Sequence, residues 1–105
     1  MSSMTLQVTT PSGTVRLAPD RVYVVGRSRN ADVVVEDGRV SRRHVELTPG
    51  PDGWTARDVS TNGMWSAGTR RSTVEVSGET RLRLGAAVGP EIVLLLPRPA
   101  PRQPA

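Results

Sequence analysis

Residues 45–59, VELTPGPDGWTARDV, contain the pattern that decides the fold class. Val45 and Leu47 alternate with a polar residue, as in a strand that buries one face. The run Pro49–Gly53 then supplies a dense turn signal, because proline, glycine and aspartate favour the backbone angles of turns. Trp54–Val59 forms the next predicted strand. The stretch therefore predicts two short β-strands joined by a turn.

The same pattern recurs on both sides of this stretch. Short β-rich runs separated by turn residues occupy Thr5–Thr9, Val15–Leu17, Val22–Val25, Val33–Val35, Val74–Val76, Leu82–Leu84 and Glu91–Leu96. No segment shows a sustained apolar period of about 3.6 residues, so no helix is predicted. Many short strands with regular turn signals are typical of an all-β sandwich or barrel.

The composition bounds the kind of site that the chain can hold. With 105 residues it is long enough for one domain with a hydrophobic core. It has no cysteine and a single histidine, His44, which excludes a disulfide framework and a zinc site of Cys/His type. We therefore expect no metal and no cofactor. The absence of cysteine is compatible with a reducing cytosol, and we predict a cytoplasmic location.

All 14 basic residues are arginine, and the formal net charge is +4. One explanation for arginine without lysine is a GC-rich genome. The functional alternatives are recognition of phosphate or carboxylate by the planar guanidinium fork, and binding of nucleic acid. Composition alone does not separate these three explanations.

The two ends of the chain differ from the middle. No apolar run approaches the roughly 18–20 residues that cross a bilayer, and the first residues lack the features of a secretory signal. We predict a disordered N-terminus over residues 1–3 and one domain over residues 4–96. Residues 97–105 contain four prolines and no apolar pattern, which predicts an extended linker to a following region. We expect no direct membrane contact from residues 1–105.

Three short loops hold polar residues that strand patterning does not explain: Val25–Ser28, Val40–His44 and Ser60–Gly63. Their side chains suit the capture of a phosphorylated residue, which carries about −1.5 to −2 charges and three strong acceptor oxygens. Such capture needs cations, short donors and backbone N–H groups. The candidate binding residues are Arg27, Ser41, Arg42, Thr61 and Asn62.

In this order and on this strand pattern, the loops resemble the forkhead-associated (FHA) family. Its signature is Gly-Arg, then Ser-x-x-His, then Asn-Gly, and the resemblance runs from about Val22 to Gly85. It implies a sandwich of two antiparallel sheets with about 10–11 short strands and binding loops at one apex. The implied roles are phosphate binding by Arg27, Ser41 and Thr61, phosphate or peptide-backbone binding by Arg42, peptide main-chain binding by Asn62, and a structural role in the loops for Gly26, His44 and Gly63.

The resemblance implies a phosphothreonine-binding module with no enzymatic activity, a function in which arginine clusters read phosphorylated motifs. The implied partners are a phosphothreonine-containing protein or peptide and a Ser/Thr protein kinase. Likeness to actinobacterial members suggests a regulatory domain of a larger protein, one candidate being an ABC-type exporter. Met64 stands where threonine or serine is frequent in the family, which leaves the side-chain selectivity of the ligand open.

Two other kinds of function remain as alternatives. The fold can serve as a docking surface that ignores phosphorylation. A basic β-barrel that binds nucleic acid needs aromatic residues interleaved on one face, and two tryptophans and one tyrosine are too few. We assign Trp54 and Trp65 to the core or to strand packing and expect no nucleic-acid partner. No nucleophile–base or metal constellation supports an enzyme.

Overall fold

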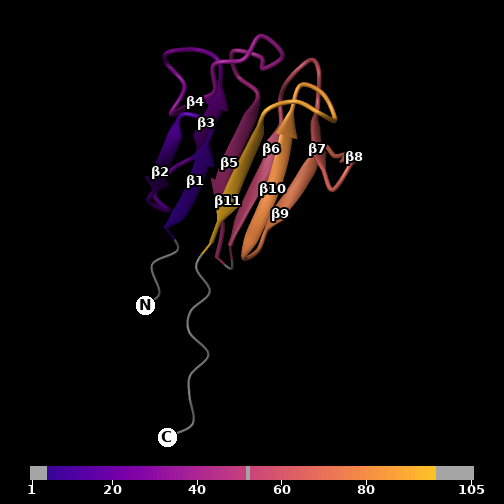
Figure 1. Ribbon diagram of the computed structural model, residues 1–105. Coiled ribbons are helices and arrows are strands. Elements are labelled where there is room, and N and C mark those ends of the chain that lie inside the picture. The colour runs from indigo at the N-terminus through magenta and orange to yellow at the C-terminus, as the bar shows by residue number, and fades with distance from the viewer. Residues whose placement is uncertain (1–4, 52, 97–105) are drawn as a thin grey trace, which may run out of the picture.

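Eleven β-strands follow one another along the chain in a computed structural model that describes residues 5–51 and 53–96 (Figure 1). They are β1 (Leu6–Thr10), β2 (Gly13–Leu17), β3 (Tyr23–Gly26), β4 (Val33–Val34), β5 (Val45–Pro49), β6 (Trp54–Asp58), β7 (Met64–Ser66), β8 (Thr69–Arg70), β9 (Thr73–Val76), β10 (Glu79–Leu84) and β11 (Glu91–Leu95). These described residues form no helix, and so none that could span a membrane. The predicted N-terminal tail (1–3) and linker (97–105) lie outside them.

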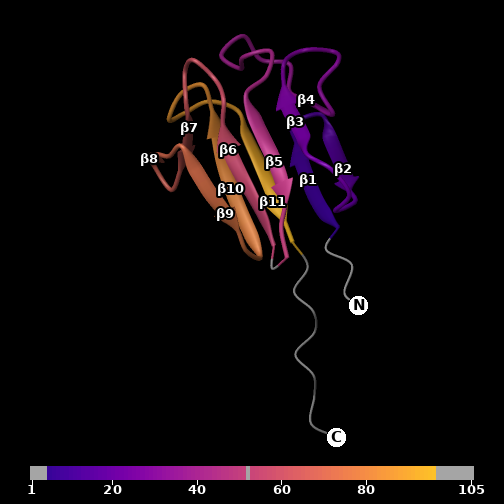
Figure 2. The same cartoon turned by 180° about the vertical axis from the view of Figure 1, so that it is seen from behind.

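The strands form two sheets, which confirms the predicted all-β sandwich. The six-stranded sheet has the order β2-β1-β11-β10-β7-β8, and the five-stranded sheet has the order β4-β3-β5-β6-β9. Neighbouring strands with a described register run antiparallel except β3 and β4, which pair in parallel. Figures 1 and 2 show the two sheets as layers with similar strand directions.

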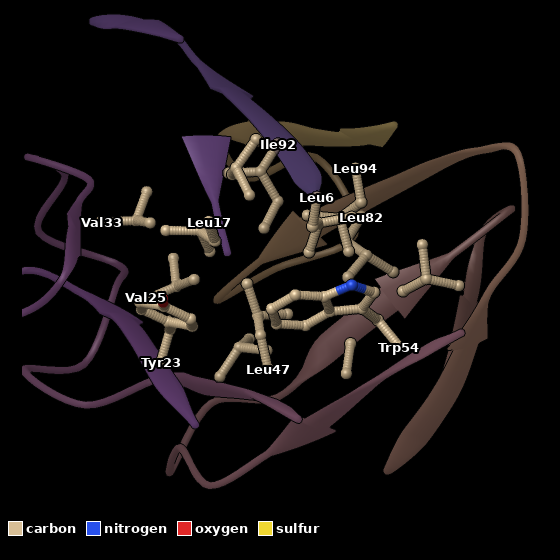
Figure 3. Close-up of a cluster of buried hydrophobic side chains, with 14 of the residues drawn as sticks. Leu6, Leu17, Tyr23, Val25, Val33, Leu47, Trp54, Leu82, Ile92 and Leu94 are labelled. Atoms are coloured by element: carbon tan, nitrogen blue, oxygen red, sulfur yellow. The ribbon is translucent and has the colours of Figure 1, made fainter. Parts of the chain in front are cut away.

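The core lies between the sheets because alternate residues of each strand point inward. Trp54 is only 2% exposed, and its ring centroid lies 5.9 Å from that of Tyr23. Leu82 and Ile92 face one another across β10 and β11 and are fully buried (Figure 3). Each such side chain contributes about 1.5–3 kcal/mol by leaving water. This packing gives the loops a rigid base.

The hairpin of β7 and β8 is absent from the strands predicted by sequence. Its two-residue turn, Ala67-Gly68, has φ angles of 51° and 80°, which is typical of a type I′ hairpin turn. Met64 on β7 points into the core and is fully buried, whereas its neighbour Trp65 faces outward and is half-buried. Trp54 therefore belongs to the core, and Trp65 packs on the outside of a strand.

The strand directions bring the motif loops to one end of the sandwich. β3 ends at Gly26, β5 begins at Val45 antiparallel to it, and β6 ends at Asp58 antiparallel to β5. The loops after β3, before β5 and after β6 therefore share one end, drawn at the top of Figure 1. We call this end the apex, comprising residues 26–28, 39–44 and 60–63.

Candidate functional site

Backbone hydrogen bonds join the three apex loops. The Arg27 N–H donates to the Ser41 carbonyl oxygen at 2.9 Å, and the Ser28 N–H donates to the Arg42 carbonyl oxygen at 3.3 Å. A Cβ atom at Gly26 would overlap the Arg42 carbonyl oxygen, so only glycine permits this close approach. The first and second loops are thus locked side by side.

His44 connects the second loop to the third from inside the protein. Its side chain is fully buried, and its Nδ1 lies 3.0 Å from the Ser41 backbone nitrogen. Because that nitrogen can only donate, Nδ1 must be the unprotonated ring nitrogen. Nε2 then carries the proton and donates to the Gly63 carbonyl oxygen at 2.7 Å. The neutral ring therefore bridges the second loop to the third.

The third loop has its own internal support. The Ser60 hydroxyl donates to Asp58 Oδ1 at 2.5 Å and accepts the Gly63 N–H at 2.8 Å. Gly63 has a φ of 99°, which side-chain-bearing residues rarely adopt. Asn62 Nδ2 donates to the Arg39 carbonyl oxygen at 3.3 Å. These bonds fix a short loop whose middle residues are presented outward.

The polar groups of the second and third loops meet at the apex surface. The Thr61 N–H points to Ser41 Oγ at the long distance of 3.5 Å. Thr61 is exposed and Ser41 is half-buried. A hydrogen bond of this length is weak, so the Thr61 N–H and the Ser41 hydroxyl can instead donate to an acceptor on a ligand.

The charges of the apex are unevenly balanced. Arg39 forms a two-pronged pair with Asp37, with both bonds at 3.0 Å, and this arginine lowers the pKa of the Asp37 carboxyl to about 2. Arg27 instead donates from Nε to the Val40 carbonyl oxygen at 3.0 Å, and within residues 5–51 and 53–96 neither it nor Arg42 pairs with a carboxylate. Two uncompensated cations therefore face solvent beside Ser41.

The structure brings all of the candidate residues to the apex. The exposed members are Arg27, Arg42, Thr61 and Asn62, Ser41 is half-buried, and the buried members are Gly26, His44 and Gly63. Supporting residues that the motifs did not indicate are Asp58, Arg39 and Gly85, whose N–H donates to the Gly63 carbonyl oxygen at 2.9 Å. Of these three residues, only Asp58 has a local signal in the sequence. It lies two positions before Ser60, and an Asp side chain often accepts a hydrogen bond from the residue two positions later. In the described part of the chain, no cluster of three metal-binding side chains occurs.

A family model described as the FHA domain matches residues 23–85, a range that contains all three loops. The chain belongs to the FHA family. The resemblance predicted from the sequence is thereby confirmed. FHA domains are interaction modules rather than enzymes.

Three solved structures show how similar this FHA domain is to others. The FHA-1 domain of Rv1747 from Mycobacterium tuberculosis has a TM-score of 0.87 and 28% identity, covering 92% of this chain and 100% of that one. A domain from a structural and functional analysis of phosphothreonine-dependent FHA interactions has a TM-score of 0.77 and 28% identity, covering 93% and 100%. The FhaA FHA domain, complexed with the intracellular domain of Rv3910, has a TM-score of 0.72 and 30% identity, covering 88% and 99%. A comparison with curated proteins gives no match.

Proposed function

We propose that this FHA domain binds phosphothreonine in partner proteins, with the phosphate at the apex. The proposal rests on the closeness of Ser41, Thr61 and Arg27, each from a different apex loop. The Ser41 hydroxyl and the Thr61 N–H lie 3.5 Å apart, and the backbone of Arg27 is bonded to Ser41. Donors from three loops can therefore surround one group of acceptor oxygens.

The side chains suit a phosphate dianion better than a neutral ligand. The Val40 carbonyl oxygen accepts the hydrogen bond from Arg27 Nε. The two terminal nitrogens of the guanidinium are then left for bidentate bonds to phosphate oxygens. Arg42 adds a second cation, and Ser41 and Thr61 add short donors. Asn62 lies next along the loop, where its amide suits the main chain of the ligand. Related FHA domains have been studied for phosphothreonine-dependent interactions, which supports the assignment.

The proposal extends to the cellular setting. A phosphothreonine ligand requires a Ser/Thr protein kinase that phosphorylates it, so such a kinase is the implied partner. The location that we propose is the cytoplasm. The likeness to the Mycobacterium tuberculosis domain fits an actinobacterial signalling system. We propose that the domain regulates a larger protein, with an ABC-type exporter as the candidate host.

A peptide library with a fixed phosphothreonine, screened beside its unphosphorylated copy, tests the function. We expect enrichment from the phosphorylated library alone. Equal enrichment from both would indicate a docking surface that ignores phosphorylation. Oligonucleotides serve as the third ligand, since a protein that tracks nucleic acid loses affinity steeply as salt rises. Tight oligonucleotide binding without a phosphopeptide preference would overturn the proposal.

A further inference from the structure

β2 is the longest of the strands that lie at an edge of a sheet. It has five residues, whereas the edge strands β4, β8 and β9 have two, two and four. Figures 1 and 2 show β2 at one side of the sandwich. An edge strand exposes unpaired N–H and C=O groups, which proteins usually protect with proline, lysine or a bulge. β2 contains neither residue, and its register with β1 has no bulge.

The turn between β1 and β2 shows which backbone groups of this edge are free. Thr10 and Gly13 are paired across a turn of two residues, so each donates its N–H to the carbonyl oxygen of the other. Because bonding alternates along an antiparallel pair, Val15 also bonds to β1. The N–H and C=O groups of Thr14 and Arg16 then point away from β1. In the described part of the chain, no backbone group of another strand or loop bonds to them.

Val15 marks a gap in the apolar packing beside this edge. Its side chain lies on the same face of the sheet as that of Val8, its cross-strand neighbour, which is fully buried. Val15 is nevertheless 40% exposed. An open groove of about 290 Å³ lies between β2 and β4, and Val15 and Val33 are among the residues that line it. The edge therefore combines free backbone groups with an incompletely covered valine.

We propose that two copies of this domain pair through their β2 strands, antiparallel to each other around a two-fold axis at Val15. Thr14 of each copy lies opposite Arg16 of the other in this arrangement, and each such pair exchanges two hydrogen bonds. The two Val15 side chains meet in a non-hydrogen-bonded pair, the kind in which opposite side chains lie closest. The pairing thus satisfies the free backbone groups and covers the exposed valine.

Charge and strand length favour this register over its two neighbours. The register centred on Arg16 places two arginines directly opposite each other, which is destabilising. The register centred on Thr14 places Arg16 opposite Ser12, which belongs to the turn rather than to the strand. Because paired strands run in opposite directions, the two apexes point away from each other and both stay open to ligands.

A single cysteine in place of Val15 tests the pairing, because the chain has no cysteine of its own. Opposite Cα atoms of a non-hydrogen-bonded pair lie about 4.5 Å apart, within the range of a disulfide. The control is Val88→Cys, since Val88 is 78% exposed on the loop between β10 and β11 and reports random collisions. Under mild oxidation we expect Val15→Cys to form linked dimers about tenfold faster, because pairing raises the effective concentration of the thiols.

Two further cysteine variants test the register. Thr14→Cys mixed with Arg16→Cys should give a linked heterodimer, because these positions lie opposite each other at a Cα distance of about 5.5 Å. Thr14→Cys alone should link no faster than Val88→Cys, since its two copies are offset by two residues. Rapid linkage of Thr14→Cys alone would contradict the register.

Sedimentation of the cysteine-free domain over a range of concentrations measures the association itself. A single strand pair makes a small interface, so we expect a weak dimer that forms as concentration rises. Val15→Lys places two like charges at the axis and should stay monomeric and folded. Linkage of Val15→Cys at the rate of Val88→Cys would overturn the proposal, and so would a dimer that persists in Val15→Lys. Peptide binding enters none of these measurements, so their failure leaves the proposed phosphothreonine site standing.

Discussion

His44 Nε2 donates a 2.7 Å hydrogen bond to the carbonyl oxygen of Gly63, a residue 19 positions further along the chain. The other ring nitrogen accepts the Ser41 N–H at 3.0 Å. One buried neutral ring thus connects the Ser-x-x-His and Asn-Gly motifs. This connection explains how a histidine can matter to a binding site without touching a ligand.

Replacing His44 should reduce stability and binding together. His44→Ala removes the partner of the Ser41 N–H and one partner of the Gly63 carbonyl oxygen and leaves a cavity, so we expect a loss of about 2–4 kcal/mol. His44→Gln is the matched control, because its amide can keep the bond to Gly63 and should lose less. Chemical unfolding and peptide titration measure both effects. An alanine variant with unchanged stability and affinity would show that the ring does not brace the loops.

Gly26 and Gly38 allow a matched test of the close approach between the first two loops. Gly26→Ala places a methyl group on the Arg42 carbonyl oxygen, whereas a Cβ at Gly38 meets nothing within 4 Å. We expect Gly26→Ala to lose about 2 kcal/mol or more of stability and to bind phosphopeptide weakly, because backbone cannot yield as a flexible side chain does. Gly38→Ala should leave both almost unchanged. Equal behaviour of the two variants would contradict the proposed packing.

Arg27 and Ser41 are expected to affect affinity far more than stability. Arg27→Ala and Ser41→Ala each remove a charge-assisted bond to phosphate, which costs about 1.5–3 kcal/mol, or roughly tenfold or more in Kd. The unfolding free energy should change by about 1 kcal/mol at most, since both side chains lie at the surface. Arg16→Ala is the charge control, because Arg16 is exposed on β2, away from the apex motifs. An equal loss of affinity in Arg27→Ala and Arg16→Ala, with none in Ser41→Ala, would indicate nonspecific charge attraction.

Lowering the pH should weaken peptide binding while the domain stays folded. The second pKa of a phosphorylated side chain is about 6, so the dianion is lost as pH falls from 7.5 to 5. Arg39 lowers the pKa of Asp37 to about 2, and Arg21 lowers that of Asp32. Because both folded-state pKa values are depressed, the stability from these carboxylates is present above about pH 4 and is lost only as pH falls through the folded values.

We therefore expect affinity to fall severalfold between pH 7.5 and 5, with a folded domain at both values. Calorimetry follows the binding, and thermal unfolding at each pH checks the fold. An affinity that is the same at both pH values would mean that the second phosphate charge is not recognised.

The sequence predicts the fold class because most strands are long enough to show their pattern. In β10, for example, Leu82 and Leu84 alternate with exposed arginines. The three-residue β7 and two-residue β8 show no such pattern, since only Met64 among them faces the core. The parallel pairing of β3 with β4 was also missed, because local alternation is the same in parallel and antiparallel strands.

The candidate site is predictable where its residues are neighbours in the sequence. Gly-Arg, Ser-x-x-His and Asn-Gly are local motifs, and strand order then places them at one apex. The bond from Asn62 to the Arg39 carbonyl oxygen and the contact of Arg70 with Gly63 join separate segments. Such contacts depend on the packed structure, so no spacing in the sequence reveals them.

A calorimetric titration of one peptide in three forms tests phosphothreonine recognition most directly. The forms carry phosphothreonine, threonine or phosphoserine at the same position, so they differ only in the phosphate or in one methyl group. We predict micromolar binding of the phosphothreonine form and far weaker binding of the other two. Equal affinity for phosphothreonine and plain threonine would contradict the proposal that the apex reads a phosphate.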